Sequence, residues 1–278
     1  MPYRILMVAP ADDLLKALRA SPLLEGHQLD TAAGGFDALR QLRRRPYDVL
    51  LSAPTTRVEE DLAQLELVRR VRPGLRVVVL AERTTPEEVI AALRSRVFAL
   101  FSAPFDRSEI ADMVARAAEA ERYTEGIEVV SAKPDWITVH VDCRRLNAER
   151  LVNFLTQLRS DVPESPRDDL MFAFREVLMN AMEHGGGFDP DQEVEVSAVR
   201  TDRTLVFYVR DPGPGFDLGD VKHAAVANDD GNPLAHAEVR SSAGLRPGGF
   251  GLLLARNIVD EMIHSERGNE VLLIKHLR

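Results

Sequence analysis

The segment Arg175-Glu-Val-Leu-Met-Asn-Ala-Met-Glu-His-Gly185 decides the fold expected for the second half of this 278-residue chain. Cap signals precede it, with Ser165 expected as the N-cap and Pro166 at the first helical position. The helix is expected to run to about His184, where the glycines at 185–187 stop it. The quoted segment is therefore predicted to form the last turns of one long helix.

Polar side chains recur on one face of that helix. Glu176, Asn180 and either Glu183 or His184 stand at the i, i+4 and i+7 or i+8 positions that line a single face. A carboxylate there can orient or deprotonate a hydroxyl group. An amide oxygen one turn away can ligate Mg²⁺, which prefers oxygen ligands. Taken alone, the same stripe also fits a helix with a solvated polar face.

Two glycine-rich segments follow the helix. Asp211-Pro-Gly-Pro-Gly-Phe216 comes directly after a strand expected over residues 204–210. Its acceptor carboxylate therefore stands beside backbone, at Gly213 and Gly215, that a flat ring can approach closely. The exocyclic amine of adenine is a fitting donor for Asp211. In isolation, this segment is also typical of an ordinary Asx-type loop.

The second glycine segment begins at Pro247 and opens a helix expected over residues 252–262. Exposed backbone amides at a helix start, with glycines for clearance, form an anion site for phosphates. The candidate residues of this site are Gly248, Gly249, Phe250, Gly251 and Leu252. Together with the helix and Asp211, this segment predicts a nucleotide site.

A long segment, residues 217–247, separates the two glycine motifs and is expected to form a lid over the nucleotide. Arg246 abuts the glycines and is its leading candidate for a phosphate contact; Lys222, His223 and Arg240 are weaker candidates. Around the site we expect a helix over residues 146–158 and strands over residues 136–142, 194–200 and 271–277.

The first half of the chain alternates strands with helices. Apolar strands are expected at 3–9, 27–32, 48–52, 76–81 and 97–101, with helices at 11–20, 35–45, 60–71, 86–94 and 105–122. This alternation predicts an α/β doubly wound parallel sheet.

The spacing of these elements resembles the response-regulator receiver domain. That family needs acidic Mg²⁺ ligands after the first strand, an acceptor aspartate after the third and a lysine after the fifth. Here Ala9 and Pro10 follow the first strand, the third ends in Ser52, and Ala103 stands in place of the lysine. Asp12 and Asp13 come too late in the sequence to be those Mg²⁺ ligands. They are expected in the first turn of a helix, where the helix dipole favours acidic residues. The domain is therefore expected to be a pseudo-receiver, without aspartyl phosphorylation, that serves docking or dimerisation.

Composition excludes several classes of protein. The net charge is −9, and its whole acidic excess lies beyond residue 120, which disfavours nucleic acid as the partner of the second half. Cys143 is the only cysteine, so no intramolecular disulfide forms. No apolar run approaches the ~18 residues of a membrane span, and no signal peptide is recognisable. A soluble, cytoplasmic protein is expected.

The three motifs resemble the N, G1 and G2 boxes of the GHKL ATPase superfamily, and within it the anti-sigma-factor serine/threonine kinases. The resemblance implies a two-layer α+β sandwich that binds ATP and Mg²⁺. It makes Glu176 the catalytic base, Asn180 the Mg²⁺ ligand and Asp211 the adenine-binding acid. Where the family usually carries a Thr near the last strand, this chain has Asn269, whose amide is a possible substitute in the adenine contact.

We therefore expect a pseudo-receiver over residues 1–122, a linker over 123–134 and a GHKL ATP-binding kinase domain over 135–278. The first functional hypothesis is an ATP-dependent serine/threonine protein kinase acting on a small partner, either an anti-sigma-factor antagonist-like protein or a sigma factor. The alternative is an ATP-binding partner-switching module without kinase activity. Both resembled families favour a homodimer.

Overall fold

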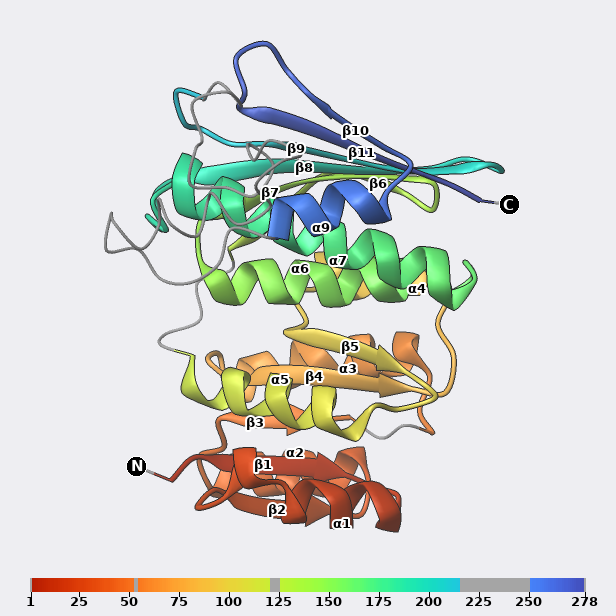
Figure 1. The fold of residues 1–278 in the computed structure, drawn as a ribbon. Coiled ribbons are helices and arrows are strands. Elements are labelled where there is room, and N and C mark those ends of the chain that lie inside the picture. Colours follow the sequence, from red (N-terminus) through yellow and green to blue (C-terminus); the bar gives the residue numbers. More distant parts are fainter. Residues whose placement is uncertain (1, 53–54, 121–125, 216–250, 278) are drawn as a thin grey trace. The chain divides into compact units, whose positions relative to one another are not determined.

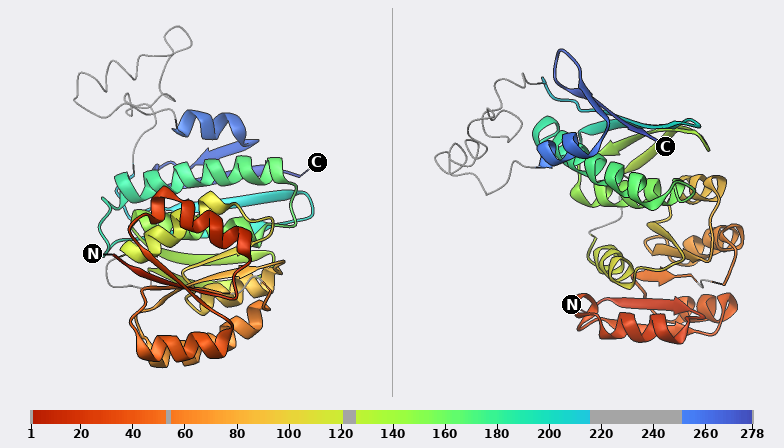
Figure 2. Two further views of the ribbon diagram at one scale, coloured as in Figure 1. Left: turned by 90° about the horizontal axis from the view of Figure 1, so that it is seen from below. Right: turned by 45° about the vertical axis from the view of Figure 1, so that its right-hand side comes forward.

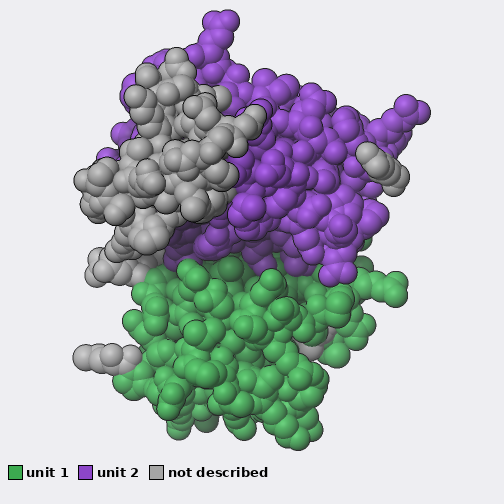
Figure 3. All heavy atoms as spheres, viewed as in Figure 1, with its two compact units in different colours: residues 1–125 green, residues 126–278 purple. Residues whose placement is uncertain are grey.

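The computed structural model describes residues 2–52, 55–120, 126–215 and 251–277. The chain divides into two compact units, Met1–Glu125 and Gly126–Arg278, which Figures 1 and 3 show. Each unit has its own sheet. None of the helices in the described ranges combines the length and the apolar character that crossing a bilayer requires.

The N-terminal unit is a doubly wound α/β fold, as the alternation predicted. Its strands are all parallel, in the order β2-β1-β3-β4-β5. They are β1 (Arg4–Val8), β2 (Gln28–Ala32), β3 (Val49–Leu51), β4 (Arg76–Ala81) and β5 (Ala99–Ser102). This order is the flavodoxin-like one, in which ligands bind outside the carboxyl ends of the strands.

Helices cover both faces of that sheet. They are α1 (Asp12–Ala20), α2 (Gly35–Arg44), α3 (Val58–Val71), α4 (Pro86–Arg94) and α5 (Arg107–Glu119), with a short 3₁₀ turn, η1 (Pro22–Leu24). α1 packs on α5, while α2, α3 and α4 follow one another in contact. Two helix starts carry side-chain caps: Thr85 forms a capping box with Glu88, and Asp106 accepts from the amides of Ser108 and Glu109.

The C-terminal unit is a two-layer α+β sandwich. Its six-stranded antiparallel sheet has the order β10-β11-β9-β8-β7-β6. The strands are β6 (Ile127–Lys133), β7 (Trp136–Asp142), β8 (Glu193–Arg200), β9 (Thr204–Arg210), β10 (Glu261–His264) and β11 (Glu270–His276). Helices α6 (Arg145–Leu158), α7 (Glu164–Asn180) and α9 (Gly251–Ile258) lie on one face of it, as Figures 1 and 2 show.

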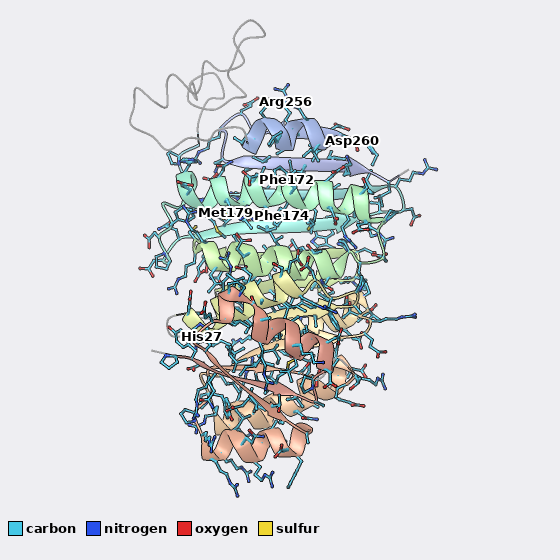
Figure 4. All side chains as sticks on the ribbon, turned by 60° about the horizontal axis from the view of Figure 1, so that its bottom comes forward. His27, Phe172, Phe174, Met179, Arg256 and Asp260 are labelled. Carbon is cyan, nitrogen blue, oxygen red and sulfur yellow. The ribbon has the colours of Figure 1, made fainter. Side chains whose placement is uncertain are left out.

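The core between these layers follows the expected apolar positions. Ile137, Val139 and Val141 of β7 are buried, and so are the corresponding inward residues of β8 and β9. From α7, Phe174 is fully buried and stacks on Phe207 of β9, with ring centroids 4.8 Å apart. Phe172, two residues earlier, leaves the helix on another side and is 40% exposed (Figure 4).

Three expectations about this unit were wrong. Residues 127–133 of the expected linker form β6, which pairs with β7 as an edge strand through an irregular register between Val129 and Ser131. That irregularity breaks the alternation by which a strand is recognised. The helix expected over 252–262 ends at Ile258, because the apolar residues beyond it belong to β10, a short strand paired with β11.

The third correction concerns the start of α7. Pro163, not Ser165, is its N-cap residue, and Pro166 lies third in the helix. A proline is tolerated there because the first helical N–H groups have no intrahelical partner. At the other end, the last turn widens into a π-helical segment, η2 (Ala181–Gly185), closed by a hydrogen bond from Gly186 N to Ala181 O of 3.0 Å. Such widened turns often occur at functional sites.

Candidate nucleotide site

Helix α7 supplies the acid and the amide. Glu176 and Asn180 are both half-buried and lie one turn apart, while Phe174, Val177 and Leu178 anchor the helix in the core. Their i, i+4 spacing places them on the same side of the helix.

Glu176 lies against the first residue of α9. A Cβ atom built on Gly251 would be 3.1 Å from Cδ of Glu176 and closer still to its Oε2. Only a glycine lets the start of α9 approach this carboxylate so closely. Helices α7 and α9 pack along each other, which holds this contact in place. The structure thus brings together Glu176 and the start of α9, the end of a helix at which the first backbone N–H groups have no intrahelical partner.

Asp211 meets the far end of the same helix. A Cβ atom on Gly185 would lie 2.5 Å from Cβ of Asp211, and one on Gly213 would lie 2.8 Å from both Asp211 Oδ1 and Gly185 Cα. Gly213 N donates to Asp211 Oδ1 at 2.8 Å. Burial raises the pKa of Asp211, while the Gly213 hydrogen bond and Arg267 oppose that rise. The hydrogen bond from Gly213 N therefore orients the Asp211 carboxylate through its Oδ1 atom.

Asn269, at the end of the β10–β11 turn, holds the backbone of Asp211. Asp211 N donates to Asn269 O at 3.0 Å, and Asn269 Nδ2 donates to Asp211 O at 3.3 Å. The Asn269 side chain is only 6% exposed. Its amide N–H group, expected as a substitute in the adenine contact, is thus engaged in positioning Asp211.

Gly215 closes the first glycine segment. Its φ of +83° is in the left-handed region, and a Cβ atom there would collide with the carbonyl of Arg267. A glycine is required on both counts. The Asp211 loop is therefore fixed against the β10–β11 turn.

Residues 142–275 match the protein family described as histidine kinase-like ATPase domain. This half of the chain forms such a domain. The match contains Glu176, Asn180, Asp211 and Gly251.

Two curated relatives match part of the chain. These are the transcriptional regulatory proteins GlrR of Escherichia coli (strain K12) and QseF of Escherichia coli O157:H7, each 28% identical over 132 residues. Each match covers 45% of this chain and 30% of the relative, so the chain spans less than a third of these relatives' length.

Solved structures that match part of the chain include a CheY-like receiver domain protein from Methanospirillum hungatei JF-1 and a response regulator from Thermotoga maritima. Both are 18% identical with a TM-score of 0.38; they cover 43% of this chain, and 95% and 100% of those chains. The flavodoxin-like fold of the N-terminal unit is instead shown by its strand order, β2-β1-β3-β4-β5.

Several expected site residues of the ATPase domain lie elsewhere or outside the described ranges. Glu183 is exposed in the π turn, with its Oε2 3.9 Å from Arg145 Nη2 of α6, and His184 is exposed beside it. The structure therefore does not place these two beside Glu176. Arg246, Gly248, Gly249, Phe250 and the lid expected over 217–247 fall outside the described residues, whereas Leu252 is half-buried in the first turn of α9.

The side chains fit a nucleotide better than a free metal ion. Within the described ranges, no cluster of three His, Cys, Asp or Glu residues could hold a metal. An Mg²⁺ ion on Asn180 would therefore need phosphate oxygens and waters as its other ligands, which is how Mg²⁺ is commonly bound beside nucleotides. At Gly185, Gly213 and Gly251 a Cβ atom would meet Asp211 or Glu176, so these glycines let the two acids pack closely against the backbone of the site.

Sequence reasoning missed two charged neighbours of Glu176. Arg175 Nη2 and Nε donate to both oxygens of Glu149, at 2.6 and 3.1 Å, and Arg175 Nη1 lies 3.4 Å from Glu176 Oε1. Glu149 belongs to α6, 26 residues earlier. Since nothing in the local pattern links the two positions, no signal in a single sequence could have found this pair.

The carboxyl edge of the N-terminal sheet carries no receiver chemistry in its described residues. At the end of β3, Ser52 donates its hydroxyl to Leu80 O and accepts from Leu80 N, so it joins β3 to β4. Asp13 pairs with Arg107 at 2.7 Å. The aspartates after β1 are thus helix-start residues, as expected.

Proposed function

We propose that the ATPase domain is the catalytic part of an ATP-dependent serine/threonine protein kinase. Its substrate is a small partner protein, either an anti-sigma-factor antagonist-like protein or a sigma factor, and the N-terminal unit regulates it as a docking or dimerisation module. The observation that carries this proposal is that α7, with the π turn that follows it, contacts both glycine-rich segments. Glu176 of α7 touches Gly251, Gly185 at the end of the following π turn touches Asp211, and Asn180 lies between Glu176 and Gly185 in the sequence.

The residues of the site have separate roles in nucleotide binding. Asp211 accepts a hydrogen bond from the exocyclic amine of adenine, and the amides at the start of α9 bind the phosphates. Asn180 supplies an amide oxygen to the Mg²⁺ ion. MgATP would supply the phosphoryl group, and an Mg²⁺ ion held by Asn180 would neutralise its charge. Positioning and charge neutralisation are the main requirements of phosphoryl transfer.

Glu176 orients the serine or threonine hydroxyl of the partner and accepts its proton. As the hydroxyl oxygen bonds to the γ-phosphorus, the bond to the β,γ-bridging oxygen breaks and ADP leaves. General-base catalysis of this kind contributes roughly 10²–10⁴-fold to a rate. The role fits the described geometry because one oxygen of Glu176 lies at the start of α9, where the phosphates would be bound.

The test is phosphoryl transfer from γ-labelled ATP, with Mg²⁺, to purified anti-sigma-factor antagonists and sigma factors. We expect label on serine or threonine of one of them, and none with Glu176→Ala. If the chain binds MgATP in calorimetry but transfers no label to any of them, the kinase proposal fails. Unchanged partner binding by Glu176→Ala would then support a partner-switching module.

A further inference from the structure

The side chain of Glu176 does not stand alone. Arg175 forms a two-pronged contact with Glu149 and presents its remaining nitrogen, Nη1, to Oε1 of Glu176. We infer that Glu149 and Arg175 are positioning residues, which hold the Glu176 carboxylate so that its other oxygen faces the start of α9. This inference rests on the proposed function for its consequence and on these contacts for its geometry.

The contact between Arg175 and Glu176 does not follow from their adjacency. Successive residues on a helix point in different directions, so neighbours in sequence do not normally face each other. Glu149, from the packed helix α6, fixes the guanidinium instead. A guanidinium held through Nε and Nη2 has a defined plane, because its fork matches a carboxylate bidentately.

The two acids of this arrangement are more buried than the arginine that joins them. The side chains of Glu149, Glu176 and Arg175 are 20%, 27% and 42% exposed, respectively. Arg175 stands between two carboxylates, and the hydrogen bond with Glu149 raises the pKa of Arg175. Removing the arginine would leave two partly buried acids without their shared cation, and both carboxylates would turn toward water.

The two oxygens of Glu176 then have different tasks. Oε1 lies 3.4 Å from Arg175 Nη1 on the α6 side, and Oε2 lies against Gly251 on the α9 side. An arginine that holds one oxygen leaves only the other for the partner's hydroxyl. Displacing a catalytic group by about 1 Å can lower a rate ~10²-fold.

The kinetic test uses Arg175→Met, Arg175→Lys and Glu149→Gln with Asp161→Asn as a matched control. Asp161 pairs with Arg200 at the other end of β8 from the Asp211 loop. We expect Arg175→Met to lower kcat about 10- to 100-fold, at or below the range of general-base catalysis. Its Kd for MgATP should stay within about twofold of wild type. Arg175→Lys should recover part of kcat, because it keeps the charge and loses the fork.

Glu149→Gln should act only through the arginine. We therefore expect it to lower kcat in the wild-type background and to have no further effect beside Arg175→Met, a non-additivity typical of one contact network. Additive losses, or a parallel loss of MgATP affinity, would indicate a general structural role and overturn the inference.

A crystal structure of Arg175→Met separates this inference from the proposed function. We expect the Glu176 side chain to leave Gly251 in that variant. If Glu176 keeps its place, the positioning role is refuted, whether or not the protein transfers phosphate. If Glu176 moves but wild-type protein transfers nothing, the positioning role stands and the kinase proposal fails.

Discussion

Gly185 and Asp211 lie so close that a Cβ atom on the glycine would be 2.5 Å from Cβ of the aspartate and closer still to its carboxylate. The glycine ends the π turn after α7, and the aspartate follows β9. A residue that sequence analysis treats only as a helix stop therefore also sets where the adenine-binding acid can stand.

Gly185→Ala should fold and lose nucleotide affinity. Asp211 must move because the added methyl group overlaps its Cβ as well as its carboxylate. Losing one buried hydrogen bond to a charged group costs about 1.5–3 kcal/mol, so we expect Kd for MgATP to rise at least ~10-fold. Calorimetric titration measures it. Gly74→Ala is the control, since a Cβ atom there meets nothing within 4 Å; equal affinity in both variants would contradict this explanation.

Gly251→Ala should impair transfer more than binding. Its methyl group would collide with Oε2 of Glu176, the far end of a flexible side chain, so the carboxylate can rotate away and the fold survives. We expect kcat to fall about 10-fold or more, because a general base out of reach loses most of its effect. Adding Glu176→Gln should then reduce kcat little further, whereas in the wild-type background it should reduce kcat strongly. Equal losses in the two backgrounds would show that Glu176 is still in place.

Asp211→Asn should separate stability from nucleotide binding. Burial raises the pKa of Asp211 above its ordinary value. The folded state therefore binds the carboxyl proton of Asp211 more tightly than the unfolded state does. Ionisation of Asp211 opposes folding as the pH rises from the unfolded-state pKa to the higher folded-state pKa. At pH 7 the neutral asparagine should give an equal or higher Tm, and the difference should shrink as pH falls toward 3.8. MgATP affinity should nevertheless fall. A lower Tm at pH 7 would mean that the ionised carboxylate stabilises the fold.

The layers of both units and the long helix could be predicted from the sequence because their signals are local. The apolar positions Phe174, Val177 and Leu178 repeat at helical spacing, and all three are buried. The strand β6 could not be recognised, because its alternation is interrupted at Val129 and Ser131 and it lies at the sheet edge.

The candidate site was predictable only in its sequence-adjacent parts. Glu176 and Asn180 are linked by helix geometry, and Asp211 by the end of a strand. The contacts that orient them come from distant positions: Glu149 acts through Arg175, and Asn269 holds the Asp211 backbone. A π turn also depends on i+5 hydrogen bonds such as that from Gly186 N to Ala181 O, which no residue preference at 181–185 specifies.

Two fully buried arginines of the C-terminal unit should respond oppositely to the same substitution. Arg159 is 1% exposed and donates Nη1 to Pro134 O at 2.7 Å, while its Nε and Nη2 have no partner among the described residues. Burial, with a contribution from Arg200, lowers the pKa of Arg159 to about 10, so it stays charged at pH 7. Arg150 is 2% exposed and donates to Asn147 Oδ1 at 2.9 Å.

We expect Arg159→Met to leave the free energy of unfolding unchanged or to raise it by up to about 2 kcal/mol, because it removes an incompletely satisfied buried charge. Arg150→Met should lower it by about 2–4 kcal/mol, since it leaves the buried Asn147 Oδ1 without this donor and removes one of the two arginines, Arg144 and Arg150, that act on the nearby Asp142. Urea unfolding of the purified chain measures both. If Arg159→Met proved as destabilising as Arg150→Met, the unpartnered nitrogens of Arg159 would have to be bound by ordered water.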